Sequence, residues 1–394
     1  MKNNRLFWIL FLLNLFNYID RQVLYSVFPL LQTDLRLNDW QLGTLASVFM
    51  LVYMCYAPFI GYLADRTSRP KLMGFSALVW SLATLACGAA KNFSHLLLAR
   101  GFIGAGEGGF TTLAQPFLAE HYPKEKHASV LALFGLALPL GSALGYALGG
   151  IIGHTWGWRL AFMALSIPGM FLAGCAWFLP DPARTQAHTP RPSWLQYMEL
   201  LKNKPFLYVC SIQTVIMFMM GGFSAWMPTY LFRYLHLNIA QAGAYFGGLI
   251  ICCGALGTYA GGKLAESRLK KSSRAYIQVM LLSLAGCLLP IWLGLWVTHL
   301  YTVLACFGLA IVFFFLPTGA IAAALVDTTS PAVRNMAFAI NIFLIHLLGD
   351  ALSPSVIGWL SHEWNLKVAM LACSAVVIPG LWFCKLAAEQ KKNF

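Results

Sequence analysis

Residues 7 to 31 read FWILFLLNLFNYIDRQVLYSVFPLL, an almost wholly apolar run with an acid and a base, Asp20 and Arg21, at its middle. At about 1.5 Å per residue, a helix of this length crosses a hydrocarbon core of about 30 Å. A charge at mid-depth costs roughly 2.5 to 3.5 kcal/mol even on a lenient scale. Asp20 and Arg21 therefore predict a functional site that faces the interior of the protein, or else a neutralised structural pair.

The composition of the whole chain is that of a membrane protein. Of its 394 residues 59% are hydrophobic and 10% are charged, whereas about a quarter of a soluble globular protein is charged. We expect an all-α multi-pass protein with twelve transmembrane helices at about 7–31, 41–64, 72–90, 95–118, 128–153, 159–179, 206–232, 241–264, 275–297, 300–325, 335–360 and 365–386. These segments are too long for the strands of a membrane barrel, which have about 9 to 11 residues.

The net charge of +13 is distributed by loop, so it indicates topology and not a nucleic acid partner. Most of the 27 Lys and Arg residues fall on the side of the membrane that carries the amino terminus. The opposite side has only Arg36, Lys91, Arg159, Arg233 and Lys367. By the positive-inside rule, both termini are cytoplasmic, and we expect a location in the plasma (inner) membrane. The ten cysteines lie in apolar segments without paired spacing, so we expect no disulfide, metal or cofactor.

The chain repeats itself once. The pattern L-x-L-N-x-x-Q-x-G at 35–43 recurs at 235–243. Two further blocks repeat, 61–65 as 262–266 and 123–159 as 331–367. We therefore expect an N-terminal six-helix bundle at 1–180, a cytoplasmic linker at 181–205 and a C-terminal six-helix bundle at 206–394. Parallel repeats of this kind place a substrate site at their interface near the membrane midplane.

The fourth predicted helix supplies partners for the opening charge pair. Arg100, Gly104, Glu107, Thr111 and Gln115 recur every three or four positions and so share one face, and Asn17, Tyr18, Arg21 and Tyr25 share a face of the first helix. Glu107 reaches roughly the depth of Asp20, so these two acids and Arg21 are expected to form one charge cluster, with Arg100 above it. A motion of Arg21 between the two acids would switch their proton affinities, which makes the cluster a candidate proton-coupling site.

The loop at 61–71 reads G-x-x-x-D-R-x-x-R-x-K and resembles the signature loop of the major facilitator superfamily. In that reading Gly61 forms a turn that lets the second helix end against the eleventh, Asp65 pairs with a base or caps a helix, and Arg66 and Arg69 stay in the cytoplasmic headgroup layer. These residues would form a cytoplasmic gate. The alternative is that the bases only anchor the topology.

Five stretches narrow the resemblance to the Spinster family of that superfamily. They are N-Y-I-D-R at 17–21, G-Y-L-A-D-R at 61–66, R-G-F-I-G-A-G-E-G-G at 100–109, G-S-A-L-G-Y at 141–146 and H-L-L-G-D-A-L-S-P at 346–354. The resemblance implies the major facilitator fold, transport of lysophospholipids or sphingoid-type lipids, and proton coupling through Asp20, Arg21 and Glu107. Tyr146 stands where the antiporter motif of the fifth helix would have a proline, which leaves the direction of coupling open.

The second half offers two further sets of candidate residues. His346 and Asp350 lie one helical turn apart, and either bind a polar group or pair with each other. The seventh helix carries Met217, Met220, Phe223, Ser224, Trp226, Met227 and Tyr230 on two adjacent faces. These side chains suit the wall of a cavity for an acyl chain, but the same pattern would serve as bundle core. Trp226 and Tyr230 would also suit the membrane interface.

Taken together, the sequence predicts a transporter that works by alternating access. The favoured cargo is an amphipathic lipid such as a lysophospholipid, coupled to protons, and the alternative is a small organic anion or drug. An enzyme is disfavoured, because the chain has no Ser-His-Asp set, no H-E-x-x-H and no nucleotide loop. A passive receptor is disfavoured by the repeat and by the acids at mid-depth. We expect a monomer among membrane lipids.

Overall fold

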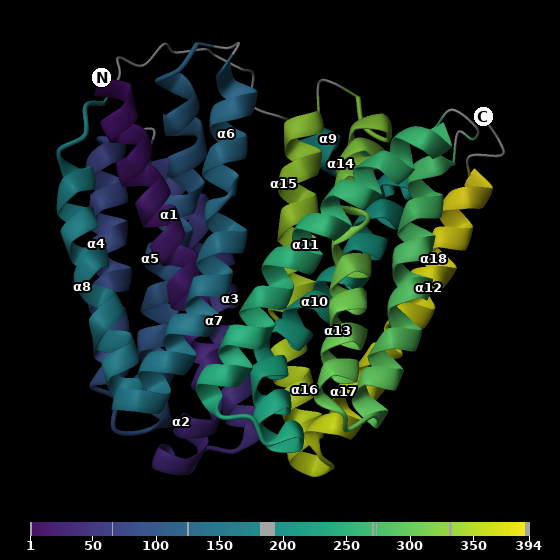
Figure 1. Ribbon diagram of the computed structural model, residues 1–394. Coiled ribbons are helices and arrows are strands. Elements are labelled where there is room, and N and C mark those ends of the chain that lie inside the picture. Colours follow the sequence, from purple (N-terminus) through teal and green to yellow (C-terminus); the bar gives the residue numbers. More distant parts are fainter. Residues whose placement is uncertain are drawn as a thin grey trace. The chain divides into compact units, whose positions relative to one another are not determined.

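The computed structural model describes residues 2–64, 66–123, 126–181, 194–269, 272, 274–330 and 333–390, and every regular element in these ranges is a helix (Figure 1). The helices are α1 (Lys2–Ser26), α2 (Phe28–Leu35), α3 (Asp39–Ala64), α4 (Arg69–Gly88), α5 (Phe93–Glu120), α6 (His127–Gly135), α7 (Ala137–Trp156), α8 (Trp158–Trp177), α9 (Trp194–Lys202), α10 (Lys204–Leu235), α11 (Ile239–Leu269), α12 (Ala275–Trp296), α13 (Leu300–Phe315), α14 (Thr318–Asp327), α15 (Arg334–Ile345), the π-helix η2 (His346–Asp350), α16 (Ser353–Glu363), α17 (Leu366–Ser374) and α18 (Val377–Gln390).

Each predicted apolar segment coincides with one helix or with a run of consecutive helices. Ten helical stretches of the described residues are long and apolar enough to cross a membrane. The stretches at α1 and α5 are not among them, although α1 has 25 residues and α5 has 28. These are the two helices that carry the charge pair and the polar stripe, and the charged residues lower their mean hydropathy.

The first predicted segment is interrupted, whereas the sequence predicted one run. α1 ends at Ser26 and α2 begins at Phe28, with a proline in the first turn of α2. Pro29 has no N–H to donate to the preceding turn, which explains a break at this point.

The chain divides into two compact units. Unit 1 comprises Met1–Thr185 and Ser224–Gly248, and unit 2 comprises Gln186–Phe223 and Leu249–Phe394. α10 and α11 each contribute residues to both units. The units are defined by contacts within the fold and do not test the predicted division of the sequence at 181–205, which stays a prediction.

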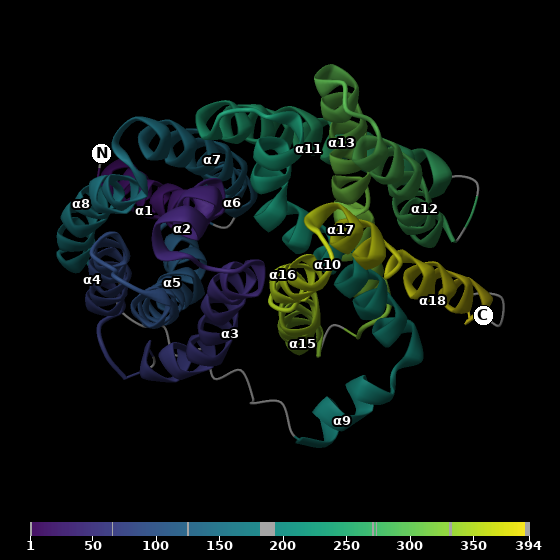
Figure 2. The same ribbon diagram turned by 90° about the horizontal axis from the view of Figure 1, so that it is seen from below.

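In unit 1, α1 packs along α7, and α5 lies between α3 and α4 (Figure 2). Glycines on α7 permit the first of these contacts. A Cβ added to Gly145 would lie 2.6 Å from the carbonyl oxygen of Ile19 on α1, closer than a side-chain carbon can come. α8 covers the other side of α4. The two ends of this unit are named here by residues: the Lys2 end, where α1 begins, and the Asp39 end, where α3 begins.

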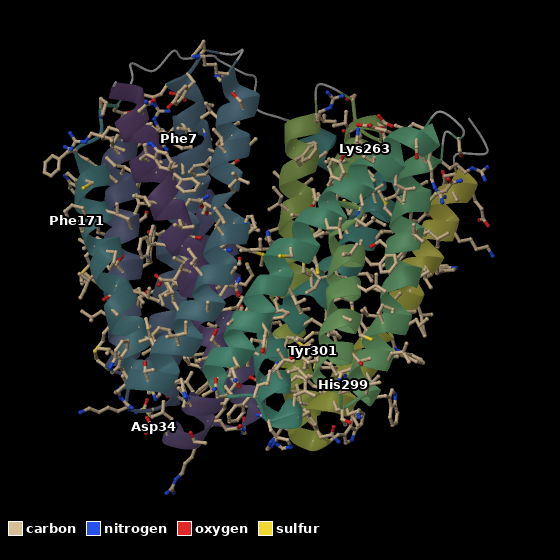
Figure 3. The ribbon with its side chains drawn as sticks, in the orientation of Figure 1. Phe7, Asp34, Phe171, Lys263, His299 and Tyr301 are labelled. Atoms are coloured by element: carbon tan, nitrogen blue, oxygen red, sulfur yellow. The ribbon has the colours of Figure 1, made fainter. Side chains whose placement is uncertain are left out.

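In unit 2, α12 packs against α13, α14 and α18, and α16 packs against α17. Ala265, Val279, Leu316 and Ala320 form a small apolar core there. Large apolar side chains also cover the outside of both units. Phe171, for example, is 72% exposed and points away from α8 at its outer edge (Figure 3). Such a surface is suited to lipid and not to water.

The repeated L-x-L-N-x-x-Q pattern forms the same helix start twice, and both copies belong to unit 1. The Asn38 side chain accepts a hydrogen bond from the backbone N–H of Gln41 at 2.8 Å, and the Gln41 side chain accepts one from the N–H of Asn38 at 3.0 Å. Asn238 and Gln241 form the same reciprocal pair at 2.8 and 3.1 Å. These bonds satisfy backbone donors that a helix start leaves free, which explains why the motif appears at both helix starts.

Replacing Gly145 with alanine should destabilise the α1–α7 contact, because the new methyl group would push against the α1 backbone. We expect a loss of roughly 1 to 3 kcal/mol, the usual cost of overpacking, seen as a lower unfolding temperature in detergent. Gly174→Ala on α8 is the matched control, since a Cβ there meets nothing within 4 Å. An equal response of the two variants would contradict this account of the α7 glycine.

Candidate functional site

A group of charged residues from α1 and α5 lies in the interior of unit 1. Asp20, Arg100 and Glu107 are 3%, 0% and 0% exposed. The side chain of Arg21 is 13% exposed, and its Nε donates a hydrogen bond of 2.7 Å to Glu107 Oε2. The ion pair therefore joins α1 to α5 at full burial of the carboxylate, as the sequence predicted for these two residues.

Asp20 is not part of that ion pair, although the charges of Glu107 and Arg100 both act on it. Its Oδ2 accepts a hydrogen bond of 3.1 Å from Thr84 Oγ1 on α4. Successive residues of a helix point about 100° apart, so Asp20 and Arg21 face different helices. Within the described part of the chain, Asp20 Oδ1 and Glu107 Oε1 have no hydrogen-bond partner. Each acid thus keeps one buried oxygen free.

Aromatic rings surround the Arg21 guanidinium. Its central carbon lies 5.1 Å from the Tyr18 ring centroid, 5.1 Å from that of Phe49 and 4.8 Å from that of Tyr53. Phe49 also lies 4.6 Å from the guanidinium of Arg100. Cation–π contacts of this kind stabilise a desolvated charge by up to about 2 kcal/mol each. Phe49 therefore connects the two buried arginines.

Among the described residues, Arg100 forms no hydrogen-bonded ion pair, although its charge acts on Asp20 and Glu107. Its Nε lies 3.5 Å from the Leu45 carbonyl oxygen, and neither of its terminal nitrogens has a hydrogen-bond partner in that part of the chain. A fully buried guanidinium with two free nitrogens is a costly arrangement. It is suited to receiving an anionic group.

Glycines of α5 bring the aromatic residues to the acid. A Cβ on Gly104 would collide with the carbonyl oxygen of Phe49, and one on Gly108 would lie 2.6 Å from that of Tyr53. The side-chain oxygens of Tyr53 and Thr111 are 2.7 Å apart, and Thr111 also donates to the Glu107 carbonyl at 2.9 Å. The small residues of the predicted stripe thus set the distance between α3 and α5.

The other predicted lining residues of this unit are dispersed. Asn17 is fully buried, and in the described structure neither of its side-chain polar atoms has a partner. Tyr25 lies edge-on to Phe28, with ring centroids 5.7 Å apart. Gln115 is exposed. The predicted face of α1 and stripe of α5 therefore run from the buried charges toward the surface.

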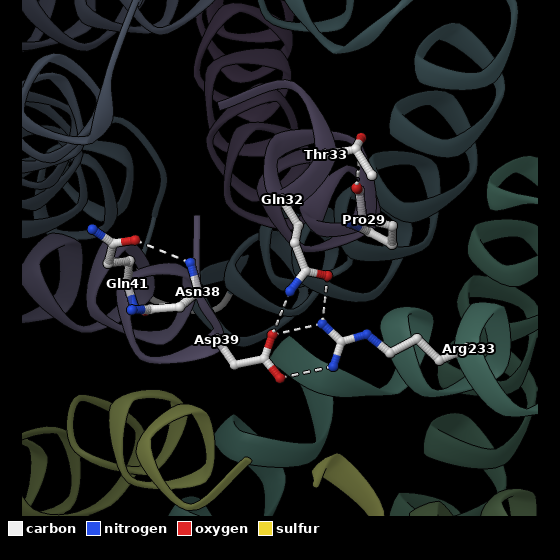
Figure 4. Close-up of polar contacts among 7 residues, drawn as sticks. All are labelled: Pro29, Gln32, Thr33, Asn38, Asp39, Gln41 and Arg233. Carbon is white, nitrogen blue, oxygen red and sulfur yellow. Dashed lines mark hydrogen bonds and ion pairs between the residues drawn. The ribbon is translucent and has the colours of Figure 1, made fainter. Parts of the chain in front are cut away.

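A second charged cluster, at the Asp39 end, was not predicted from the sequence. Arg233 on α10 donates to both oxygens of Asp39, at 2.6 and 2.7 Å, and to Gln32 Oε1 at 2.8 Å (Figure 4). Gln32 in turn donates to Asp39 at 3.0 Å. We call Gln32, Asp39 and Arg233 the clasp. In sequence, Arg233 looked like one more loop base, and nothing local to Asp39 indicated a partner 194 residues away.

An exposed ion pair lies at the same end. Asp34 on α2 accepts hydrogen bonds from Arg159 and from Trp158 Nε1, the latter at 3.0 Å. These bonds, that of Arg159 foremost, hold the pKa of Asp34 below its usual value. This pair joins α2 to α8 and does not involve α10.

In unit 2, the predicted residues of the eleventh segment lie together. His346 Nδ1 is 2.9 and 3.0 Å from the two oxygens of Asp350, so the pair contact that the sequence allowed is formed. His346 and Asp350 are the first and last residues of the π-helix η2, whereas the sequence predicted the spacing of an ordinary α-helix. The Asp350 side chain also packs against Gly221, where an added Cβ would lie 2.5 Å from the Asp350 Cβ.

The predicted residues of α10 differ in burial. Phe223, Trp226, Met227 and Tyr230 are at most 4% exposed, whereas Met217, Met220 and Ser224 are half-buried. The Phe223 ring contacts those of Phe307 and Phe314, and the Trp226 ring lies 5.3 Å from that of Phe28. In these contacts the aromatic residues act as helix-packing core, the alternative that the sequence left open.

At the Lys2 end, Asp65 lies outside the described residues. Gly61 lies inside α3 and not in a turn, contrary to the expectation, because the helix continues to Ala64. The Arg66 guanidinium stacks on Tyr62 at 3.6 Å. Arg69 binds Glu120 at 2.7 Å and Asp181 at 3.1 Å, so it ties the start of α4 to the end of α5, and its place in a headgroup layer stays a prediction.

The comparisons with known proteins agree with this architecture. Residues 10–322 match the model of the Major Facilitator Superfamily. The chain is 30% identical over 411 residues to "Sphingosine-1-phosphate transporter SPNS2" of Danio rerio, covering 94% of this chain and 81% of that protein. It is 26% identical over 416 residues to "Probable sphingolipid transporter spinster homolog 2" of Arabidopsis thaliana, covering 95% and 85%.

Among solved structures, a bacterial homologue of the human lysosomal transporter Spinster in an inward-facing, unoccupied conformation has a TM-score of 0.88 at 20% identity, covering 98% of this chain and 97% of that one. The nucleoside transporter NupG (D323A mutant) has a TM-score of 0.80 at 13% identity, covering 97% and 99%. At such identities the likeness shows the fold. With a family match over most of its length, this multi-pass membrane protein belongs to the major facilitator superfamily, and the Spinster proteins are its homologues over nearly the full chain.

Proposed function

We propose that this protein moves an amphipathic lipid, such as a lysophospholipid, across or out of the membrane by alternating access, driven by protons. Two relatives are named as transporters of sphingolipid or sphingosine-1-phosphate, each a lipid with a polar head. In this proposal the protein is a monomer in the plasma membrane, and the Lys2 end of unit 1 faces the cytoplasm. The runner-up cargo is a small organic anion or drug.

The observation that carries the coupling proposal is that the two buried acids have different hydrogen-bond partners. Arg21 donates a hydrogen bond to Glu107, while the hydrogen bond that Asp20 accepts in the described residues comes from the Thr84 hydroxyl. One guanidinium thus serves one of two carboxyl groups. If Arg21 turned toward Asp20, Glu107 would lose its counter-ion, and a proton would remove the uncompensated charge. Asp20 and Glu107 are therefore the proposed proton-exchanging groups.

The free donors near these acids support an anionic headgroup. Arg100 has two terminal nitrogens and Arg21 has one, Nη2, without a partner in the described residues. Guanidinium groups bind phosphate through paired hydrogen bonds. A phosphate head would fit both the lysophospholipid and the sphingosine phosphate class, while a carboxylate would fit the runner-up. His346 and Asp350 are proposed as further headgroup contacts, and the half-buried Met217, Met220 and Ser224 as lining for an acyl chain.

Two devices are proposed to gate the path. At the Lys2 end, Arg69 bound to Glu120 and Asp181 would act with Gly61, Asp65 and Arg66. At the Asp39 end, the clasp would hold α10 to α2 and α3, since Arg233 joins Gln32 and Asp39. Alternating access requires the two gates to open in turn.

Flux into proteoliposomes tests the choice of cargo. We expect uptake of lysophospholipids, measured over a panel of headgroups with and without an imposed pH gradient, to be saturable and gradient-dependent. Small organic anions, assayed in the same vesicles, should move much more slowly. Preferential uptake of the anions would favour the runner-up, and flux that never saturates would argue against a carrier.

Replacing Glu107 with glutamine tests the coupling. Gln imitates the neutral acid, so we expect lysophospholipid flux to lose its response to the pH gradient while lipid binding survives. Glu363→Gln on the exposed end of α16 is the control and should behave like the parent. A stable Glu107→Gln protein whose flux follows the gradient as the parent does would refute the role of this residue.

Breaking the clasp tests the gate at the Asp39 end. Asp39→Asn leaves Arg233 without its carboxylate, so we expect faster labelling, from the outside, of a cysteine placed at the buried Thr229 of α10. Exchanging the charges, Asp39→Arg with Arg233→Asp, should restore slow labelling. The control is Asp34→Asn, which removes an ion pair at the same end without touching α10. Equal labelling in all of these proteins would exclude the clasp as a gate.

A further inference from the structure

Tyr146 is the residue of α7 at which the sequence departs from the expected antiporter motif. Its side chain is 1% exposed, and its hydroxyl donates a hydrogen bond of 2.8 Å to the backbone carbonyl of Ser224 on α10. A tyrosine buried this deeply needs a partner for its hydroxyl. What is unusual is that the acceptor is a carbonyl inside a helix.

Ser224 lies four residues before Pro228, inside the continuous helix α10. In an α-helix the carbonyl of a residue accepts from the N–H four positions later, and proline has no N–H. The Ser224 carbonyl therefore lacks its ordinary helical donor. The Tyr146 hydroxyl takes the place of the missing group, at hydrogen-bonding distance.

The position of the Tyr146 ring is fixed by the helices around it. The Ser26 hydroxyl donates to the Tyr146 carbonyl at 3.0 Å, and the ring meets that of Phe246 edge-on at 4.8 Å between centroids. Gly243 on α11 is packed so closely that an added Cβ would collide with the Tyr146 carbonyl oxygen. The hydroxyl thus belongs to a residue whose backbone contacts α1 and α11 and whose ring contacts α11.

The hydrogen bond lies where α10 passes from one compact unit to the other, since the first segment of unit 2 ends at Phe223 and unit 1 resumes at Ser224. Gly221 and Gly222 precede this point and Pro228 follows it, and helices bend at proline and at paired small residues. Beyond it, α10 is tied to the rest of unit 1 by the Trp226–Phe28 ring contact and by the Arg233 clasp. The bond is therefore the first of several contacts that hold this segment to unit 1.

We propose that Tyr146 is the positioning residue of the Asp39-end gate: its hydroxyl satisfies the carbonyl freed by Pro228 and so favours the state in which residues 224–235 stay docked on α7. This inference rests on the alternating access proposed above. When the segment leaves α7, the hydrogen bond breaks, and the freed carbonyl loses its donor. Tyrosine at position 146 thus adds a preference for the closed gate. A proline at position 146 could not give it, because proline has no hydroxyl to donate.

A double-mutant cycle of Tyr146→Phe and Pro228→Ala tests this assignment in the full-length protein. The reporter is Thr229→Cys, labelled from outside with an impermeant maleimide and read at that residue by peptide mass spectrometry, so the native cysteines do not interfere. Tyr146→Phe alone should raise the labelling rate by about two- to tenfold, the equilibrium shift that one net hydrogen bond provides. In the Pro228→Ala background it should change nothing, because the alanine then donates its own backbone N–H to the Ser224 carbonyl.

Tyr56→Phe, a hydroxyl removal at a half-buried site of α3, controls for a general loosening. If Tyr146→Phe folds poorly, the same argument requires Pro228→Ala to restore the yield. An equal effect of Tyr146→Phe in both backgrounds, or no effect in the parent, overturns the proposal. Labelling needs neither lipid nor a proton gradient, so a failure of lipid transport with an intact cycle would count against the proposed function alone.

Discussion

The rest of unit 1 depends on the ion pair between Arg21 and Glu107. A charge pair without access to water is stable only when its geometry is good and its other hydrogen-bonding groups are accommodated. Here the α5 glycines admit the α3 backbone, and α3 supplies the Phe49 and Tyr53 rings against the guanidinium. The apolar surroundings and the small residues of α5 are thus conditions for the charge pair. The same conditions leave Asp20 on another helix face, where its hydrogen bond comes from a hydroxyl and not from a cation.

The two ends of unit 1 each have an ion pair between an arginine and a carboxylate, and the two carboxylates differ in burial. At the Asp39 end the clasp carboxylate is 7% exposed and receives both arms of the Arg233 guanidinium, so that losing Arg233 leaves a buried negative charge. At the Lys2 end, Glu120 is 46% exposed beside Arg69, and such solvated pairs contribute less than about 1 kcal/mol. Breaking the clasp is therefore expected to cost more than breaking the pair of Arg69 and Glu120.

The sequence was informative where a local pattern carried the constraint. Apolar length predicted the segments, and helical spacing brought Arg21 to Glu107. It was silent where the partner is distant and ordinary. Thr84 is one hydroxyl in an apolar helix, and Arg233 resembles any loop base, so neither carries a signal of its contact. The π-helix at His346 adds one residue to a turn, which no apolar periodicity of this short segment reveals.

The helices that precede the two copies of the repeated loop differ in their charged residues and in how each accommodates a proline. At the offset of 200 that aligns the loops 35–43 and 235–243, Asp20 and Arg21 correspond to Met220 and Gly221, so the charge pair belongs to the first half alone. Both helices carry a proline shortly before the repeated loop, Pro29 and Pro228. In the first half the helix ends at Ser26 and restarts, whereas α10 continues through its proline with the Tyr146 hydroxyl on the freed carbonyl. In α10 the carbonyl freed by the proline accepts its hydrogen bond from a side chain of α7, so this arrangement depends on α7 staying in place. Pro29 therefore ends a helix by itself, whereas the continuity of α10 at Pro228 is supported by a side chain of α7, so the shape of α10 would respond to the proposed gate.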